Sequence, residues 1–273
     1  MAGRRETHAN PAGGIIDTHV FVISPYFLRQ HFLPEGIDAT LDALVRDMDA
    51  VGVEAAVGTM FVTHEDDLVG SVPEGLSRHR TRVAAQLHLQ PNRPEWSTAA
   101  VRAAAAHPSV VGARAMLSVF RMRPDDERLT PVFEACAKAE LPVQLVFDAS
   151  SFSHPDAFAA LADAFPELPL VLAVTRGRNR AALKGLLRRP RVYAQLPGLL
   201  DAEAAGGEPA VLRWAARNLP TEKVMFGSDR LGREREYAAK VRALRVLPAP
   251  ARGWVARGTA LSVYGGRLAK ALA

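Results

Sequence analysis

The sequence predicts a single (β/α)8 barrel of the α/β class, and two observations lead to this prediction. Eight apolar runs of strand length alternate with helical patterns along a chain of 273 residues, close to the roughly 250 residues of a typical barrel. The runs are continuously apolar rather than alternating, as expected for parallel strands covered on both faces. The predicted strands are residues 15–22, 55–62, 83–89, 110–117, 142–147, 170–174, 192–196 and 223–226.

Helical patterns separate these strands, and most of them end shortly before a proline, which is a common stop signal for helices. The C-terminal segment, residues 252–273, is expected to form one or two final helices that close the barrel. The helices predicted between strands are residues 40–48, 97–107, 130–139, 157–165 and 209–218.

An open, doubly wound sheet is the alternative, because it produces the same alternation with fewer strands. Such a sheet usually has a glycine-rich phosphate turn after its first strand, but residues 18–24 contain no glycine. No repeat, low-complexity segment or linker divides the chain. We therefore expect one domain, residues 14–273, preceded by a disordered leader of residues 1–13.

The composition is that of a soluble globular protein, with 48% hydrophobic and 23% charged residues, both ordinary values. No apolar run approaches the roughly 20 residues that span a bilayer, so no membrane association is expected. The single cysteine, Cys136, lies in a helical pattern and is interpreted as a packing residue. The lack of any disulfide fits a reducing cytoplasm, where we expect the protein to be located.

The basic character of the chain raises the possibility of nucleic-acid binding, since the net charge is +5 and the isoelectric point is near 9.7. Nucleic-acid proteins concentrate charge on one face and interleave it with stacking aromatics. Here the arginines are spread along the chain, and the densest cluster, residues 176–191, has no aromatic among its arginines. A nucleic-acid partner is therefore not expected.

The most informative motif is Asp17-Thr18-His19-Val20-Phe21, at the end of the first apolar run. Residues two apart share a face of a strand, so His19 and Phe21 are expected to point into the same pocket. In a barrel, functional side chains lie at the carboxyl ends of the strands. On the later strands, these positions hold His88, Arg114, Asp148, Arg176, Gln195 and Asp229.

The chain resembles the amidohydrolase-related family, the metal-dependent barrel hydrolases and decarboxylases of the amidohydrolase superfamily. Its first strand and Gly227-Ser228-Asp229 are similar to the motifs that hold the family's histidines and catalytic aspartate. The resemblance also includes segments 48–57, 110–114 and 165–173. It extends over nearly the whole chain and implies the barrel fold.

The resemblance also identifies departures from the family's metal site. Phe21 replaces the second histidine of the first strand, and the fifth- and sixth-strand positions hold Val146 or Phe147 and Val174. Of the family's ligands only His19 and Asp229 remain, whereas an open zinc site needs three protein ligands. No metal and no other cofactor is therefore expected.

The two surviving residues are the predicted catalytic pair. A carboxylate among apolar side chains has a raised pKa, which suits Asp229 to acid–base work with His19 as its partner. Alternatively, Asp229 caps a helix and His19 bonds only to the backbone, or Arg230 clamps Asp229 and lowers its pKa. Asp17 is interpreted as structural, deeper on the same side of the strand.

Arg114 is the predicted substrate anchor, because it matches an arginine that metal-independent lactonases of the superfamily use to hold carboxylates. A guanidinium fork suits that task, although a salt bridge with Asp148 is the structural alternative. Arg176 precedes a helix and is expected to favour an anion. Phe21, Asp148 and His88 complete the predicted binding residues.

Two functions are consistent with these features. The first is a metal-independent enzyme acting on a small, carboxylated, partly aromatic or unsaturated substrate. Its reaction would be lactone or amide hydrolysis, or proton-transfer chemistry such as cyclisation or decarboxylation. The second is a retired barrel that serves as a binding module. A small anionic organic molecule is the expected partner, and a homodimer is possible for this type of barrel.

Overall fold

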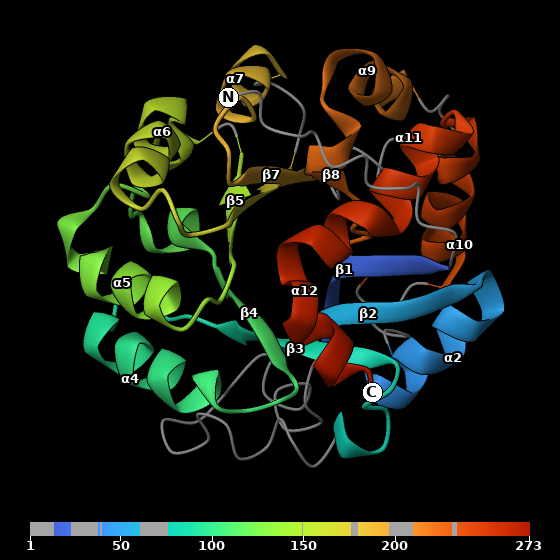
Figure 1. Ribbon diagram of the computed structural model, residues 1–273, viewed down its shortest axis with the longest axis horizontal. Coiled ribbons are helices and arrows are strands. Elements are labelled where there is room, and N and C mark those ends of the chain that lie inside the picture. Colours follow the sequence, from blue (N-terminus) through green and yellow to red (C-terminus); the bar gives the residue numbers. More distant parts are fainter. Residues whose placement is uncertain are drawn as a thin grey trace, which may run out of the picture.

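The computed structural model describes residues 14–22, 38, 40–60, 76–148, 150–175, 180–196, 210–230 and 234–273. They form eight parallel strands in the order β1 to β8 (Figure 1), so the predicted barrel is confirmed. The predicted leader, residues 1–13, lies outside the described residues. The strands are β1 (Ile15–Val22), β2 (Val53–Met60), β3 (Val83–His88), β4 (Val110–Ala115), β5 (Val143–Phe147), β6 (Leu170–Val174), β7 (Val192–Gln195) and β8 (Val224–Met225).

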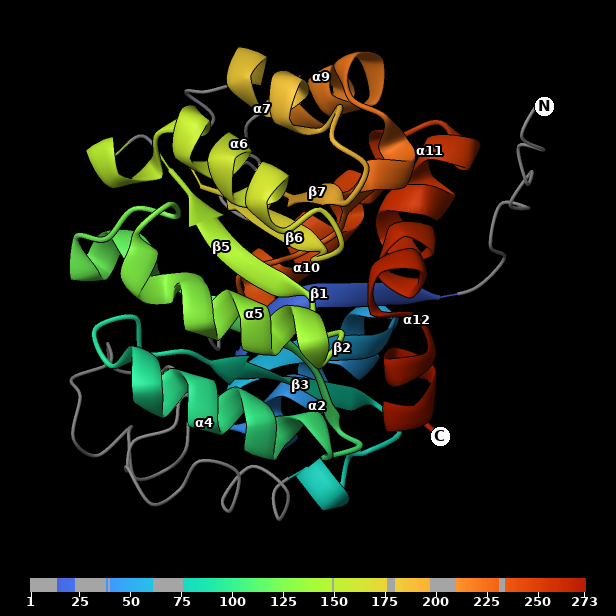
Figure 2. The same cartoon turned by 60° about the vertical axis from the view of Figure 1, so that its left-hand side comes forward.

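Helices surround the strands as an outer layer (Figures 1 and 2). The expected helices are all present with small shifts at their ends, and the helix expected after Arg176 is α7, whereas α10 had not been predicted. The helices are α2 (Leu41–Val51), α4 (Pro94–Ala105), α5 (Thr130–Lys138), α6 (Pro155–Ala164), α7 (Arg180–Leu186), α9 (Ala210–Asn218), α10 (Glu234–Ala243), α11 (Ala249–Gly253) and α12 (Thr259–Ala271).

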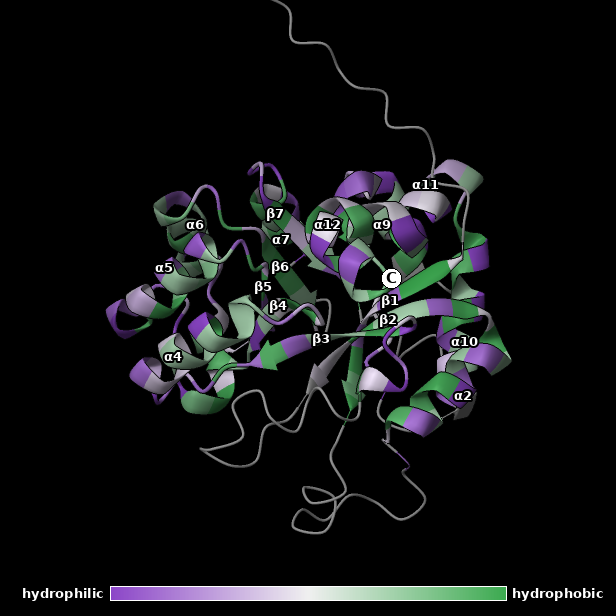
Figure 3. Ribbon diagram, turned by 60° about the horizontal axis from the view of Figure 1, so that its bottom comes forward, coloured by the Kyte–Doolittle hydropathy of each residue, from purple (hydrophilic) through white to green (hydrophobic). Residues whose placement is uncertain are grey.

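The hydrophobic core has two parts. The larger part lies between the strands and the outer helices and includes Cys136, which is fully buried. Burial raises the pKa of the Cys136 thiol to about 12, so this cysteine is a packing residue, as expected. The apolar strands and the helix faces toward them form this layer (Figure 3).

The smaller part of the core closes the amino-terminal end of the barrel. Helix α12 lies across this end, and its Tyr264 packs among strand residues that include Ile16 and Val111. The C-terminal segment therefore closes the barrel, as predicted.

The barrel is closed at the seam between β1 and the chain around β8. Only two residues of β8 pair as a ladder with β7, and the pairing with β1 is made by single backbone bonds. Thr18 N donates to Phe226 O at 3.0 Å, Asp229 N to His19 O at 2.8 Å, and Phe21 N to Arg230 O at 3.0 Å. The register of β1 shifts between Asp17 and Val20. This seam brings the first strand's motif against Asp229.

None of the described helices is long and apolar enough to cross a membrane.

Candidate active site

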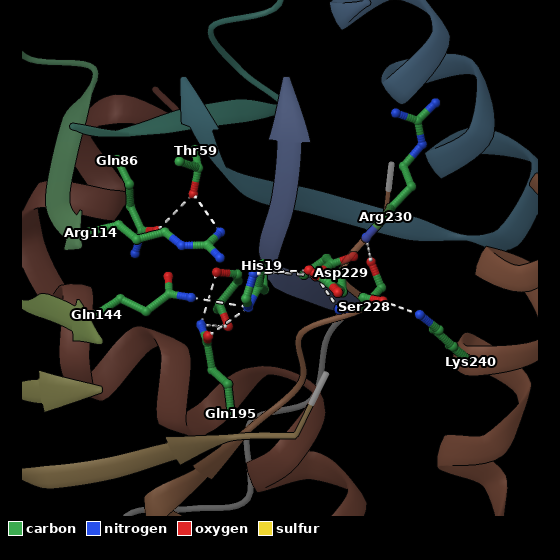
Figure 4. Close-up of polar contacts among 12 residues, drawn as sticks. His19, Thr59, Gln86, Arg114, Gln144, Gln195, Ser228, Asp229, Arg230 and Lys240 are labelled. Carbon is green, nitrogen blue, oxygen red and sulfur yellow. Dashed lines mark hydrogen bonds and ion pairs between the residues drawn. The ribbon is translucent and has the colours of Figure 1, made fainter. Parts of the chain in front are cut away.

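His19 and Asp229 form a pair at the seam, as the sequence predicted for these two residues (Figure 4). His19 Nε2 lies 3.2 Å from Asp229 Oδ1. The histidine side chain is 1% exposed and that of the aspartate 35%, so the pair joins the barrel interior to its mouth. Gly227 makes this approach possible, because a Cβ atom there would lie 2.7 Å from the Cβ of His19.

The pKa of Asp229 is lowered, which corrects the prediction of a raised value. Burial does act to raise it, but contacts with His19 and the charges of Arg114 and Lys240 outweigh burial and bring the pKa to about 2. Burial and the charge of Arg114 lower the pKa of His19, while Asp229 opposes this effect. At neutral pH the pair is therefore a carboxylate beside a neutral imidazole, and it is ready to accept one proton.

Arg230 does not clamp Asp229, so that alternative is wrong. Its guanidinium pairs instead with the buried Asp47 of α2, with Nε 2.9 Å and Nη2 2.5 Å from Oδ2. The cation that supports Asp229 from outside the barrel is Lys240 of α10, whose Nζ donates to Ser228 O at 2.6 Å.

Asp17 has a structural position, as expected, but its carboxylate faces the seam and α10 rather than the pocket. Oδ1 accepts hydrogen bonds from the backbone N–H groups of His19 at 3.1 Å and Ser228 at 3.0 Å. Burial raises the pKa of Asp17 to about 6, although contacts with Ser228, His19 and Tyr237 oppose the rise. One buried carboxyl group thus holds the backbones of both strands of the seam.

Arg114 lies inside the barrel beside Phe21. Its guanidinium carbon is 4.4 Å from the centre of the Phe21 ring, and that ring makes an edge contact with His19 at 5.4 Å. His19 and Phe21 therefore do face the same pocket. Arg114 Nη1 donates to Thr59 Oγ1 at 3.2 Å.

The guanidinium of Arg114 is otherwise unsatisfied by the described residues. Nε is buried without a hydrogen-bond partner, and no ion pair joins Arg114 to a described residue. The side chain is 2% exposed, and burial lowers its pKa to about 10. Asp148 is not its partner, because Asp148 accepts a hydrogen bond from Ser150 N at 2.8 Å and caps a turn.

Three buried glutamines extend the polar interior: Gln86 on β3, Gln144 on β5 and Gln195 on β7. Gln86 Nε2 donates to Tyr264 Oη at 2.8 Å, while Gln144 and Gln195 both contact His19. Sequence reasoning placed Gln195 at the mouth but gave no role to any of the three. Each of them could have been recognised as an amide side chain in an otherwise apolar strand, because a buried amide needs a hydrogen-bond partner.

The remaining residues predicted for the site lie at different places, and not all of them face the barrel interior. His88 ends β3, and burial together with the charge of Arg114 lowers its pKa to about 4, so it is neutral at ordinary pH. Arg176 lies outside the described residues. Phe147 packs outward on Phe158 of α6, with ring centres 5.2 Å apart.

The alternation of side chains along β5 and β6 shows which of their apolar residues face the barrel interior. Gln144 points inward to His19, so Val146, two residues later, shares its face and Phe147 does not. On β6, Val174 belongs to the outer core, and Ala173 is the inward residue beside Gln195. Of Phe21, Phe147 and Val174, only Phe21 contacts the polar interior.

The residues of the site do not fit a divalent metal. His19 and Asp229 are two donors, and the described residues contain no group of three histidine, cysteine, aspartate or glutamate side chains that could hold an ion. The neighbouring inward positions supply Phe21, Val146 and Ala173, none of which has a side-chain lone pair. The guanidinium of Arg114, which acts electrostatically on both His19 and Asp229, adds a positive charge where a cation would have to bind.

Comparisons with known proteins agree with the fold. The sequence model of the amidohydrolase family matches residues 16–266. No similar sequence was found among the curated proteins.

Solved structures of low sequence identity share the barrel. An uncharacterised TIM-barrel protein from Bordetella bronchiseptica is 17% identical, with a TM-score of 0.71 over 94% of this chain and 99% of that one. The 2,6-dihydroxybenzoate decarboxylase from Rhizobium is 12% identical, with a TM-score of 0.69 over 93% and 99%. The 5-carboxyvanillate decarboxylase from Novosphingobium aromaticivorans, whose structure contains manganese, is 14% identical, with a TM-score of 0.64 over 92% and 96%.

Proposed function

Because the chain belongs to the amidohydrolase family, we propose that it is an enzyme that acts without a metal on a small carboxylate. Arg114 holds the carboxylate, and the His19–Asp229 pair acts as the general base. The proposal has three parts: the anchor, the base and the substrate class. Each part is supported by a different observation.

The observation that carries the proposal is the unsatisfied guanidinium of Arg114. A buried cation is costly unless a charge or several hydrogen bonds compensate it. The described residues give Arg114 one hydroxyl, one aromatic face and the charge of Asp229, but no ion pair. A carboxylate fits the remaining N–H groups, because two oxygens accept from a guanidinium edge in parallel. The anchor therefore selects an anionic substrate and orients it.

The base is the His19–Asp229 pair. With Asp229 ionised and His19 neutral, the pair takes up a proton as water attacks an acyl carbon or as the substrate loses an acidic proton. In hydrolysis, a bond forms between the water oxygen and the acyl carbon, and His19 then returns the proton to the leaving oxygen or nitrogen. In decarboxylation of a hydroxylated aromatic acid, neutral His19 first takes the proton of the ring hydroxyl and then gives it to the ring carbon that bears the carboxylate. The carbon–carbon bond breaks, CO2 leaves, and the resulting phenolate takes a proton from water.

The substrate class follows from the surroundings of the anchor and from the similar structures. Phe21 provides an aromatic face beside Arg114, which favours a planar ring next to the bound carboxylate. Two of the similar structures are decarboxylases named for hydroxylated or methoxylated aromatic acids. We therefore favour a small aromatic carboxylate and decarboxylation as the first reaction to assay.

The test uses protein stripped of metal by chelator and incubated with a panel of hydroxybenzoates and aryl lactone carboxylates. Loss of substrate and release of product or CO2 are followed by chromatography and gas analysis. We expect turnover that added chelator does not reduce and that Arg114→Met abolishes. Arg189→Met is the matched control, because Arg189 pairs with Asp163 outside the barrel. Turnover that appears only after adding manganese or zinc would overturn the proposal.

A retired barrel is the second candidate, and one observation favours it. Phe21 covers one face of the Arg114 guanidinium, and Arg114 is almost fully buried, which is how a plugged pocket would look. Binding of aromatic carboxylates without any turnover, across the whole panel, would support this candidate over the enzyme.

A further inference from the structure

The orientation of the Gln195 amide is fixed by its surroundings. Its Nε2 lies 2.9 Å from Thr18 O and 2.6 Å from Thr18 Oγ1. A backbone carbonyl only accepts, and Thr18 Oγ1 uses its single proton on Phe226 O at 2.7 Å. The group of Gln195 that faces Thr18 must therefore be the amide NH2, with one N–H for each oxygen.

Since the NH2 group is committed to Thr18, the amide oxygen of Gln195 faces His19. Oε1 lies 3.2 Å from Nδ1 of the imidazole. An amide oxygen has no proton to give, so this contact is a hydrogen bond only if Nδ1 carries one. Both residues are fully buried, and no water replaces the bond if it is not made.

We propose that Gln195, oriented by Thr18, is a positioning residue that keeps the proton of neutral His19 on Nδ1, so that Nε2 is the nitrogen that takes and returns the reacting proton. This inference rests on the proposed function, because it assigns the basic atom of that site. It concerns a property of the free protein that exists whether or not a substrate is found.

The opposite tautomer, with the proton on Nε2, is less well supported by the site. It would let Nε2–H donate to Asp229 Oδ1, 3.2 Å away, but it would leave the amide oxygen of Gln195 facing an unprotonated Nδ1. The Asp229 side chain is 35% exposed, so water can solvate it when Nε2 has no proton. The amide oxygen of Gln195 is buried, so water cannot replace Nδ1–H as its partner.

Gln144 fits this assignment after a half-turn of its amide. Its Nε2 lies 3.0 Å from His19 Nδ1, and its Oε1 is buried without a partner. A half-turn keeps the shape of the side chain and exchanges the two atoms. Oε1 then accepts from Nδ1–H together with Gln195, and the unsatisfied acceptor disappears.

The arrangement assigns a role to each neighbour of His19 during the reaction. When Nε2 accepts a proton, the imidazolium has an N–H toward each of two acceptors, Gln195 Oε1 and Asp229 Oδ1. Nδ1 stays protonated throughout. The amide thus stabilises the product of proton uptake without contacting the substrate itself.

Nuclear magnetic resonance of protein labelled with ¹⁵N-histidine measures the tautomer directly, because a protonated and an unprotonated ring nitrogen have well-separated shifts. The chain has eight histidines, and the signals of His19 are assigned by their loss in His19→Gln. With full-length wild-type protein at a pH where His19 is neutral, we expect a protonated Nδ1 and an unprotonated Nε2. The reverse pattern would overturn the inference.

Substitution of the amide tests the cause. Gln195→Met keeps the length of the side chain and removes the acceptor, and we expect His19 to change toward the Nε2-protonated form as Gln144 donates to Nδ1. Gln86→Met is the matched control, since Gln86 is equally buried but contacts Tyr264 instead of His19. An unchanged His19 tautomer in Gln195→Met would also overturn the inference.

The two proposals fail separately. If His19 is protonated on Nε2 while metal-free turnover is found, the role of Gln195 is wrong and the proposed function stands. If His19 is protonated on Nδ1 and no carboxylate is bound or turned over, the proposed function fails and the positioning of His19 stands. With a substrate in hand, Gln195→Met should lower kcat about 10-fold or more and leave KM unchanged, because Arg114 still binds the carboxylate.

Discussion

Arg114 illustrates, at the scale of one residue, a conflict between binding and stability. Its guanidinium is buried with one hydrogen bond to Thr59, so the free protein bears a desolvation cost that a ligand relieves. We expect Arg114→Met to weaken aromatic carboxylate binding about 10- to 100-fold, which corresponds to about 1.5–3 kcal/mol for lost charged hydrogen bonds. The same variant should unfold at unchanged or higher denaturant concentration, with a gain of up to about 1 kcal/mol.

Calorimetric titration and urea unfolding of the same samples check both halves of this prediction. Arg189→Met is again the control, and it should leave carboxylate binding unchanged. A variant that loses binding only because it unfolds would contradict the assignment of Arg114 as a ligand anchor.

The pH dependence of activity follows from the pair of residues at the seam. Catalysis by a base requires neutral His19, and its pKa lies below the usual 6.5, so kcat/KM should rise with pH and reach half of its plateau below pH 6.5. Asp229 stays ionised over this range because its pKa is about 2. Since its carboxylate raises the pKa of His19, Asp229→Asn should move the limb to lower pH and reduce kcat by about 10²- to 10⁴-fold.

Rates measured from pH 4 to pH 8 for the wild type and Asp229→Asn test this account. If the rise of kcat/KM moved to higher pH in the variant, Asp229 would not act through His19.

Asp17 should make stability depend on pH in the opposite sense to an ordinary salt-bridged carboxylate. Its pKa is about 6 in the folded protein against the ordinary 3.8 of an aspartate, so the folded state binds the extra proton between these values. Stability is therefore greatest below pH 4 for this group and falls as pH rises to 6, by up to about 3 kcal/mol. Asp17→Asn keeps an oxygen for the two backbone N–H groups and removes this titration.

Urea unfolding at intervals between pH 4 and pH 7 measures the difference between wild type and Asp17→Asn. The two stability curves should diverge as pH rises, with the variant the more stable at pH 7. Parallel curves would mean that Asp17 titrates near its ordinary value.

At the scale of elements, the seam between β1 and β8 depends on a glycine. A Cβ at position 227 would lie 2.7 Å from the Cβ of His19, so Gly227→Ala must displace a strand whose neighbours are close-packed. We expect a loss of about 1–3 kcal/mol in unfolding free energy and a fall in kcat, because His19 moves away from Asp229. Gly185→Ala in α7 is the matched control: nothing lies within 4 Å of its Cβ, and a gain of up to about 1 kcal/mol is expected from helix propensity.

Thermal unfolding and turnover of the two alanine variants separate strain at the seam from the general effect of replacing glycine. Equal behaviour of the two variants would contradict the close approach of β8 to His19.

The strands could be predicted from sequence because a parallel barrel buries both faces of each strand, which leaves continuous apolar runs such as β6. The short β8 was predicted as well, at residues 223–226, although single backbone bonds replace a full ladder between it and β1. The inward and outward faces near the mouth could not be assigned reliably. The run 142–147 is apolar on both faces except for Gln144, and only the contact of Gln144 with His19 shows that Val146, and not Phe147, faces the interior.

The pKa of Asp229 was also beyond sequence reasoning, for a different reason. Apolar neighbours were visible, and they predict a raised value. The lowering comes from His19, Arg114 and Lys240, which lie far apart in the chain and meet only in the folded barrel. Arg230, adjacent in sequence, was the obvious partner, but it pairs with Asp47.

At the scale of the whole molecule, the fold is that of the amidohydrolase family, and the barrel interior contains the buried cation of Arg114. One end is closed by α12 and an apolar plug. Above the plug lie three glutamines, the neutral imidazole of His19 and the buried guanidinium of Arg114, which makes no ion pair with the described residues. In the proposed function, the fixed cation of Arg114 provides the positive charge that attracts and orients the substrate.

Metal content tests this central claim most directly. The protein is purified without chelator, dialysed against manganese and zinc in turn, freed of excess metal and measured by elemental analysis. The account predicts much less than one equivalent of any divalent metal and unchanged carboxylate binding. One equivalent of tightly held metal, lost in His19→Gln or Asp229→Asn, would contradict it.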